Sequence, residues 1–406
     1  MTDLQYRYPV EALFTGCSLG NLHAFARLSA RTDLLGLWSA TDNQYYVGEW
    51  TVRILAGGAP LEPVETLFSV ADQTTILTRD SVSAQQRFFL PVGDERDPEK
   101  AAAEQRIACF LITLSNGGSQ AVQVALRHTV TFPAVGTDRF TKQPAEDQKN
   151  KTFHVHRHGH FCTIVTDRRP AESRVFGSDI PWSSCTADSS TVNAEYPIEL
   201  EAGGNRDLFF AISFSPLGMD DALAAFKKAT ASRDIFTRTT ETVGDTLSRS
   251  TIFTPNRSIN RGMQWAKVNM MRVRHRYRTG EAFTNDPPQD IVVLRDLAWF
   301  VLGSDYFIPG FSRRLLDAAV KYGVHDGGKI TEYYHADERS PVQHDYHLNI
   351  NDDTPLVVWA LAHHCIATGD VKLAAEYYPV MKRACEWTLR QVKDGLVRCT
   401  VQGTNV

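Results

Sequence analysis

The hydrophobic pattern of the sequence changes its period near residue 220, and this change limits the folds available to the chain. Between about residues 60 and 215, short runs rich in Val, Ile, Thr and Phe are separated by turn sequences such as Asn116-Gly117-Gly118. In Ala121–Phe132 apolar and polar residues alternate, which is typical of a strand with one buried face in an antiparallel sheet. Many such strands without helices between them predict an N-terminal antiparallel β-sandwich at residues 1–218. The clearest expected strands are Val64–Val70, Thr74–Thr78, Gln86–Leu90, Arg106–Leu114, Val122–Phe132, Phe161–Val165 and Leu208–Phe214.

After about residue 258 the pattern becomes helical. Val292–Gly303 and Leu356–Ile366 are apolar on nearly every side, which predicts buried helices. Phe311–Tyr322 and Lys372–Lys393 are amphipathic, which predicts helices that cover the buried ones. Alternation of buried and amphipathic helices is what two concentric layers would produce, so we predict an (α/α)6 toroid, a ring of helix hairpins.

The predicted toroid is incomplete. We assign its first part to residues 258–406 and a helical linker to residues 219–257. Asp296 and Asp352 each open a predicted buried helix, and they are 56 residues apart. Six hairpins of that length do not fit before Val406. We therefore expect the sequence to be a fragment or a truncated reading of a longer enzyme.

Charge and composition exclude several classes of protein. The 43 Lys and Arg residues against 47 Asp and Glu give a net charge of −4, which argues against nucleic-acid binding. No apolar run approaches the roughly 20 residues of a membrane span, so no membrane partner is expected. The seven Cys residues are scattered, with no C-x-x-C pair, which indicates reduced thiols and a cytoplasmic protein.

Acidic residues lie at the starts of the two predicted inner helices, in Arg295-Asp296 and Asn351-Asp352-Asp353. Carboxylates are favoured at helix N-termini, where the backbone carries a partial positive charge. Side by side, such ends would form a polar floor able to bind several sugar hydroxyls, and an Arg–Asp pair would hold its carboxylate in one orientation. The alternative is that these residues are ordinary helix caps with an internal ion pair.

Two segments of the helical half resemble the start of the catalytic domain of glycogen-debranching enzymes of the amylo-α-1,6-glucosidase type: LRDLAWFVLGSDYFIPGFSRRLLDAAVKY and NINDDTPLVVWALAHHCIATGD. The Arg-Asp pair is similar to the one with which glucoamylases hold the terminal glucose. The N-D-D-x-P-L run resembles the second inner helix of the same six-hairpin glycosidase superfamily. Cellobiose-type phosphorylases carry a related arrangement behind a β-sandwich. The resemblance covers about residues 258–395 by motif, and the sandwich by architecture alone.

The resemblance implies a glycoside hydrolase that acts on α-glucosidic linkages of an oligosaccharide or polysaccharide, by inversion through a directly attacking water. It implies that Arg295 and Asp296 bind the glucosyl unit and that Asp352 or Asp353, with Asn351, lines the same subsite.

Other contacts around this subsite follow from the same resemblance. Trp299 is a candidate for stacking on a sugar face, with a place in the helical core as the alternative. Glu332 and Tyr333, with Tyr334 and His335, lie in a predicted loop at 323–349 and are candidate rim contacts, with a solvated loop as the alternative.

The catalytic residues are not assigned. Glycosidic cleavage needs two carboxyl groups that flank the bond. In the family the general acid lies at the next inner helix and the base near the last, so both would fall beyond Val406. Two alternatives stay open: a sugar phosphorylase on the same scaffold, with phosphate in place of water, or a catalytically silent carbohydrate-binding or scaffold protein.

One histidine pattern suggests a competing site. His154, His156, His158 and His160 alternate and would share one face of a strand, and imidazoles in a row can bind Zn or Ni. Gly159 and the lack of a nearby carboxylate favour a polar outer face of the sandwich instead. No Walker loop or dinucleotide fingerprint is present. We therefore expect neither a metal nor a cofactor.

Overall fold

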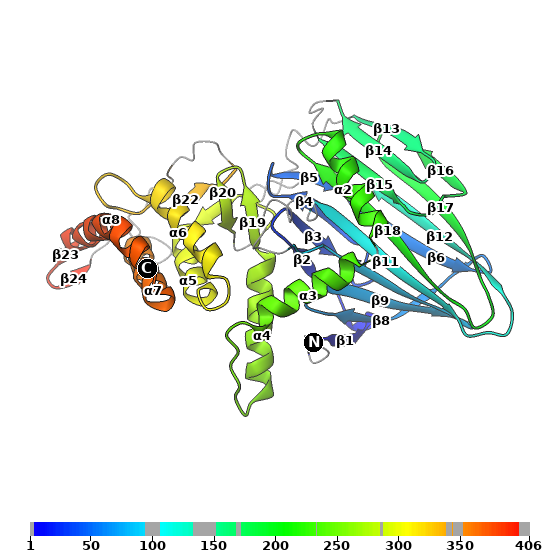
Figure 1. Ribbon diagram of the computed structural model, residues 1–406, viewed down its shortest axis with the longest axis horizontal. Coiled ribbons are helices and arrows are strands. Elements are labelled where there is room, and N and C mark those ends of the chain that lie inside the picture. The colour runs from blue at the N-terminus through cyan, green and yellow to red at the C-terminus, as the bar shows by residue number, and fades with distance from the viewer. Residues whose placement is uncertain are drawn as a thin grey trace. The chain divides into compact units, whose positions relative to one another are not determined.

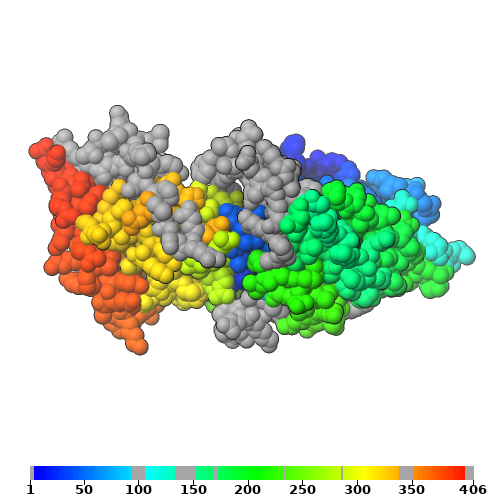
Figure 2. Space-filling model, turned by 90° about the horizontal axis from the view of Figure 1, so that it is seen from above, coloured from blue at the N-terminus to red at the C-terminus, as the bar shows by residue number. Residues whose placement is uncertain are grey.

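The computed structural model describes residues 4–93, 106–132, 152–167, 172–232, 234–284, 287–337, 343 and 352–397. The chain divides into two compact units, Met1–Ser39 with Gln44–Gly244 and Ala40–Asn43 with Asp245–Val406. We call them the sheet unit and the helical unit. In the space-filling view the sheet unit carries the blue to green colours and most of the helical unit the yellow to red ones (Figure 2). The division at Gly244 falls inside the segment expected as a linker.

The sheet unit contains two antiparallel sheets (Figure 1). Among the described residues, the strands of the first sheet lie in the order β1 (Tyr6–Pro9), β8 (Glu62–Phe68), β9 (Asp72–Arg79), β10 (Val82–Phe89), β11 (Ile107–Asn116), β18 (Asn205–Ser215), β15 (Ser173–Ser178), β14 (Phe161–Thr166) and β13 (Phe153–His158). A short 3-10 turn at Val10–Ala12 follows β1.

The second sheet runs β16 (Ser184–Ala187), β17 (Thr191–Leu200), β12 (Val122–Thr131), β6 (Glu49–Ala56), β4 (Leu34–Ser39), β3 (Ala24–Leu28) and β2 (Ser18–Gly20). Two further strands pair beside this path, β5 (Gln44–Val47) with β4 and β7 (Ala59–Pro60) with β6. All seven strands expected from the sequence are present, which confirms the antiparallel β-sandwich.

The core lies between the two sheets. Trp50 of the second sheet packs edge-on against Phe110 of the first, with ring centroids 4.6 Å apart. The alternation in β12 buries Leu126, His128 and Val130, as expected. Trp50 Nε1 donates to His128 Nδ1 at 3.1 Å, and burial lowers the pKa of His128 to about 3, so this histidine is neutral in the core.

Helices α2 (Met219–Ala231) and α3 (Ile235–Ser248) follow the last strand of the sandwich. Figure 1 shows α2 lying against β15 and β18, where Phe226 and Ala222 join a buried cluster with Phe209. Arg106, next to β11, binds the Asp221 carboxylate of α2 at 3.0 and 2.8 Å. The predicted linker is thus helical, and its first helix packs as part of the sheet unit.

The helical unit contains α4 (Arg257–Arg272), α5 (Leu294–Ser304), α6 (Pro309–Gly323), α7 (Asp353–Thr368) and α8 (Val371–Arg390). In the described parts of this unit three short strand pairs accompany them: β19 (Arg274–Tyr277) with β20 (Gly280–Phe283), β21 (Ile291–Val293) with β22 (Tyr333–His335), and β23 (Val392–Lys393) with β24 (Leu396–Val397). The four helices predicted after residue 290 are all present.

The hairpins α5–α6 and α7–α8 are two copies of one arrangement. Contacts join the starts of α5 and α7 and also their ends, so these two helices run parallel. The same holds for the first halves of α6 and α8, where Arg313 binds Asp370 and Tyr377 binds Asp317. Two stacked hairpins are the repeat from which a toroid is built, and the closed ring stays a prediction.

Buried positions give the length of this repeat. Leu297 and Val301 of α5 recur as Val357 and Leu361 of α7, 60 residues later. The spacing of 56 residues between Asp296 and Asp352 underestimates the repeat because Asp352 lies just before α7, whereas Asp296 lies inside α5.

The histidine pattern falls on β13, an edge strand, where His154, His156 and His158 are exposed; His160 lies in the following turn. Within the described parts of the chain, no group of three or more His, Cys, Asp or Glu side chains is arranged to hold a metal ion. No helix of these parts has both the length and the apolar character needed to cross a membrane.

Candidate functional site

The starts of α5 and α7 lie side by side, and a strand pair brings a third segment to them. β21 leads directly into α5 and pairs with β22, with Val293 opposite Tyr333. The Leu294 N–H donates to the Glu332 carbonyl oxygen at 2.9 Å. Residues 332 and 333 therefore flank the first turn of α5, and from Tyr333 onward the segment is a strand rather than the loop expected from the sequence.

Arg295 joins the two helix starts. Its Nη1 donates to Asp352 Oδ2 at 2.9 Å, and its backbone N–H donates to Asp353 Oδ1 at 3.0 Å. The other oxygen of Asp352, Oδ1, has no hydrogen-bond partner among the described residues. This carboxylate is thus fixed through Oδ2, while Oδ1 is a buried acceptor.

Asp353 lies beneath this pair. Its side chain is 1% exposed, and burial raises the pKa of its carboxyl to about 8, with the nearby Asp352 adding to the rise and Arg295 opposing it. At neutral pH the carboxyl is therefore mainly protonated. Asp353 is buried and accepts a hydrogen bond from the backbone of α5, so it lies between the two helices.

Asp296 is the neighbouring acid on α5 and is partly exposed. Burial raises the pKa of its carboxyl; Arg295 opposes this rise and Asp352 adds to it. Arg295 and Asp296 lie on either side of the exposed face of α5, opposite the buried Leu297. Asp296, Arg295 and Asp352 thus form one polar group at the end of two parallel helices.

Trp299 lies one turn after Arg295 on the same exposed face and is 53% exposed. Among the described residues Trp299 is therefore not enclosed in the buried core of the helical unit. Its ring is nearly perpendicular to that of Trp359 on α7, with an interplanar angle of 88° and centroids 5.5 Å apart. Trp359 is 48% exposed and was not singled out from the sequence, although it follows Trp299 by the 60-residue repeat.

The remaining candidates differ in their exposure. Glu332 and Tyr334 are buried, whereas Tyr333 and His335 are partly exposed. His335 Nδ1 lies 3.2 Å from both carboxylate oxygens of Asp290. Asn351 lies outside the described residues. The structure therefore brings Arg295, Asp296, Trp299, Asp352, Asp353, Glu332 and Tyr333 together around two helix starts.

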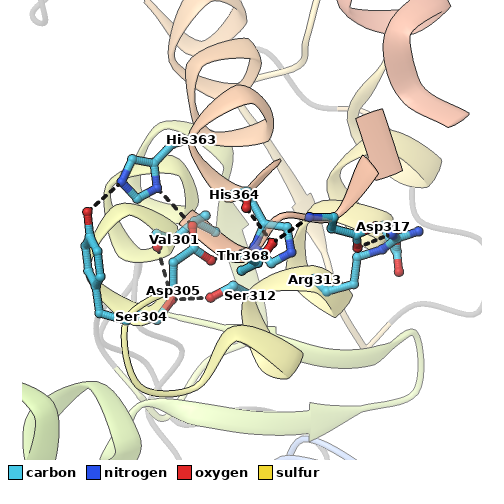
Figure 3. Close-up of polar contacts among 11 residues, drawn as sticks. Val301, Ser304, Asp305, Ser312, Arg313, Asp317, His363, His364 and Thr368 are labelled. Atoms are coloured by element: carbon cyan, nitrogen blue, oxygen red, sulfur yellow. Dashed lines mark hydrogen bonds and ion pairs between the residues drawn. The ribbon is translucent and has the colours of Figure 1, made fainter. Parts of the chain in front are cut away.

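A second polar cluster joins the other ends of α5 and α7 (Figure 3). The buried Asp305 carboxylate lies between two imidazoles, with Oδ2 2.9 Å from His363 Nδ1 and Oδ1 2.6 Å from His364 Nδ1. Tyr306 Oη lies 3.2 Å from His363 Nε2. Sequence patterns did not indicate this cluster, because its members meet only when the helices stack.

Arg313 makes the corresponding connection between α6 and α8. It binds Asp317 on its own helix and reaches Asp370 and Glu376 at 2.9 Å each. Tyr377 donates to Asp317 at 2.7 Å. Both clusters fix the relative register of the hairpins, and this register sets the positions of Arg295 and Asp352.

No family model and no curated protein matches the sequence. Among solved structures, a candidate kojibiose phosphorylase from the human microbiome superposes with a TM-score of 0.62 at 11% identity. The match covers 91% of this chain and 57% of the phosphorylase chain, so this chain spans little more than half of that protein.

Two other solved structures match less well. A family GH92 inverting mannosidase from Bacteroides thetaiotaomicron has a TM-score of 0.45 at 10% identity, over 95% of this chain and 64% of that one. A galactose mutarotase related enzyme from Lactobacillus acidophilus has a TM-score of 0.31 at 9% identity, and the match covers 50% of this chain and 98% of that one. The similarity to the phosphorylase establishes a shared fold, a β-sandwich followed by a helical domain.

Proposed function

We propose that this chain binds a glycosyl residue at the paired starts of α5 and α7, as part of an enzyme that acts on glycosidic bonds. The observation that carries the proposal is the Arg295–Asp352 pair, in which a guanidinium and a carboxylate, both partly exposed, lie side by side at the two helix starts. A sugar hydroxyl is both a donor and an acceptor, so two neighbouring hydroxyls match a carboxylate and a guanidinium placed side by side.

The surrounding residues suit the same ligand. A guanidinium carries five N–H donors, so donors of Arg295 other than Nη1–H can reach a hydroxyl. Asp296 adds a second carboxylate on the same face, and Tyr333 flanks the first turn of α5. Trp299, one turn along, presents an exposed aromatic ring of the kind that packs against the apolar C–H face of a sugar. Oligosaccharides and polysaccharides are the proposed substrate class.

For the reaction we propose hydrolysis of an α-glucosidic bond, of the glucosidase or debranching type. Support comes from the motif resemblance of residues 258–395 and from the positions of its Arg-Asp and Asp-Asp residues at one end of parallel helices. We do not assign the general acid to Asp353: its pKa is raised to about 8, but its burial keeps it from a glycosidic oxygen.

The test is sugar binding by the whole chain, with Arg295→Lys as the variant. Lys keeps the charge but loses the planar set of donors, so we expect affinity for glucose and maltose to fall about tenfold or more. Isothermal titration calorimetry measures this. Arg127→Lys is the matched control, since Arg127 forms an exposed ion pair with Glu195 in the sheet unit. No binding of glucose, maltose, isomaltose, trehalose or glycogen by the unaltered chain would refute the proposal.

A sugar phosphorylase is the second candidate, and the shared fold with the candidate kojibiose phosphorylase favours it. The two reactions differ in their nucleophile, water or phosphate. Release of reducing sugar without phosphate identifies a hydrolase, whereas phosphate-dependent release of a sugar 1-phosphate identifies a phosphorylase. Tight binding with neither product would identify a carbohydrate-binding protein without catalytic activity.

A further inference from the structure

The second sheet of the sandwich has a gap along one edge of β6. The other edge of β6 pairs with β12 along its length. Among the described residues, β4 pairs with β6 only at Leu34 and Trp50, and β7 pairs with it only from Leu55 onward. The chain before β4 turns at Thr32, whose φ of 63° is left-handed, so it does not extend the pairing. Within the described chain, residues 51–54 therefore face no strand on this edge.

A pocket of about 240 Å³ lies at this gap and reaches the facing sheet. A water molecule in the liquid takes up about 30 Å³, so the pocket has room for about eight groups of that size. Its inner wall consists of buried aliphatic side chains from β6, from β9 and from the segment between β7 and β8: Val52, Ile54, Leu61 and Leu77. Gln86 of β10 is the one polar side chain among the buried lining residues.

Gln86 carries an acceptor that the described residues do not use. Its side chain is 1% exposed and faces the interior of the sandwich, as do those of Ala84 and Phe88 on the same strand. Its Nε2 donates to the Thr32 carbonyl oxygen at 3.4 Å, and this contact orients the amide. Its Oε1 is buried without a hydrogen-bond partner among these residues. Because such an oxygen is costly to bury, a donor group placed in the pocket would stabilise the protein.

The inner wall suits a carbon chain better than it suits water. A buried water usually makes about three hydrogen bonds, whereas the Gln86 amide is the only polar side chain that the buried lining residues offer. An aliphatic chain placed against the same wall leaves water, which is favourable.

The charges at the mouth of the pocket balance among the described residues. Arg31, Arg53 and Glu62 line the mouth and are exposed. Arg53 binds Asp33 at 2.8 Å, so two guanidinium groups stand against two carboxylates. The mouth therefore selects neither an anion nor a cation.

We propose that this pocket binds a small neutral molecule with an aliphatic body and one O–H or N–H donor at its inner end, and that Gln86 Oε1 accepts from that donor. The site lies within the sheet unit, so the inference does not rest on the proposed function. Aliphatic walls with one convergent polar group are the usual composition of a small-molecule site, in which the polar group sets the orientation of the ligand.

The test compares two isomers, 1-hexanol and 1-methoxypentane, on the whole chain. Both are small enough for the pocket, but only the alcohol donates a hydrogen bond. Ligand-observed NMR titration measures their dissociation constants, which for molecules of this size should be about millimolar. We expect 1-hexanol to bind about threefold to tenfold more tightly than the ether.

The variant Gln86→Met keeps the length of the side chain and removes the amide, so it should bind both isomers with equal affinity. Gln85→Met is the matched control and should keep the preference for the alcohol, because Gln85 is the exposed neighbour on β10. Leu77→Phe leaves Gln86 in place but narrows the pocket, so it should weaken binding of both isomers. Thermal melting checks that each variant is folded, and Leu77→Phe decides the matter if Gln86→Met does not fold.

Each other result overturns the inference. Equal binding of the isomers by the unaltered chain means that Gln86 Oε1 accepts nothing from a ligand, and no binding of either means that only water enters the pocket. Tighter binding of hexanoate than of 1-hexanol means that the mouth selects an anion. A preference for the alcohol that survives in Gln86→Met, or binding unchanged in Leu77→Phe, means that the isomers bind elsewhere. Loss of both isomers by folded Gln86→Met means that the amide shapes the pocket instead of binding the ligand.

Discussion

The buried carboxyl of Asp353 should make the stability of the helical unit depend on pH, and Asp353→Asn should remove this dependence. Folding raises the pKa of this carboxyl from the ordinary value of 3.8 to about 8, chiefly through burial. Between these values the folded chain holds a proton that the unfolded chain has lost. Raising the pH therefore favours unfolding, and stability present below about pH 4 is lost as the pH rises through 8.

The size of the effect follows from the one proton involved. The free energy of unfolding should fall by about 1.4 kcal/mol for each pH unit within this window, or about 3 kcal/mol between about pH 5.5 and 7.5. The same carboxyl is also influenced by the charges of Asp352, Arg295 and Glu332. These charges move the pH range of the effect, but stability still falls as the pH rises. Asn resembles the protonated acid, and its oxygen can still accept the Arg295 N–H.

Denaturant unfolding followed by far-ultraviolet circular dichroism at several pH values measures this. The stability of Asp353→Asn relative to the unaltered chain should rise steadily with pH across the window. Asp370→Asn is the control: a backbone N–H of Leu373 lowers the pKa of the Asp370 carboxyl, so its effect changes only in acid, below the window. If the difference in free energy of unfolding between Asp353→Asn and the unaltered chain does not change with pH, Asp353 is ionised across the whole window. The argument that burial keeps it protonated would then be wrong.

Two further substitutions test the contacts that set the hairpin register. Asp305→Asn leaves one of the two imidazole N–H groups at Asp305 without an acceptor, so the free energy of unfolding should fall by about 2 kcal/mol, measured by thermal melting. Tyr306→Phe removes only an exposed 3.2 Å contact and should have a much smaller effect; equal effects would contradict a bridging role for Asp305. Gly328→Ala should destabilise by about 3 kcal/mol or more, because Gly328 has φ +92° and a Cβ there would lie 2.3 Å from the Arg383 carbonyl oxygen of α8. Its neighbour Gly327 has open space around the same position, so Gly327→Ala should melt close to the unaltered chain, and similar losses at both sites would argue against the α8 contact.

The sequence predicted strands mainly from runs rich in Val, Ile, Thr and Phe, whether one face is buried, as in β12, or both, as in Leu208–Phe214 of β18. β12 is the clearest example. The strands β3 and β4 were not predicted, because Ala24–Leu28 and Leu34–Ser39 contain no Val, Ile or Thr and are not rich in the residues that favour strands. The helices after residue 290 were predicted because each has either an apolar circumference or one apolar face.

The candidate site was predictable as far as it depends on helix starts. Asp296 and Asp352 could be placed together because parallel neighbouring helices bring their first turns to one end. The roles of other residues depend on packing that the sequence does not encode locally. Asp353 is next to Asp352 in the sequence, yet it is buried. Trp359 could be matched with Trp299 only after the 60-residue repeat had been measured from the buried positions of the structure.

The charge balance at the paired helix starts restricts what can enter there. With Asp353 protonated, the described residues place Asp296, Asp352 and the nearby Glu332 against the single guanidinium of Arg295, and the positive ends of two helices offset this acidity only in part. An inorganic anion would therefore meet more negative than positive charge among these groups, whereas an uncharged polyhydroxylated molecule would not be repelled by it. A reaction that used phosphate at this position would therefore need basic side chains supplied by another part of the protein.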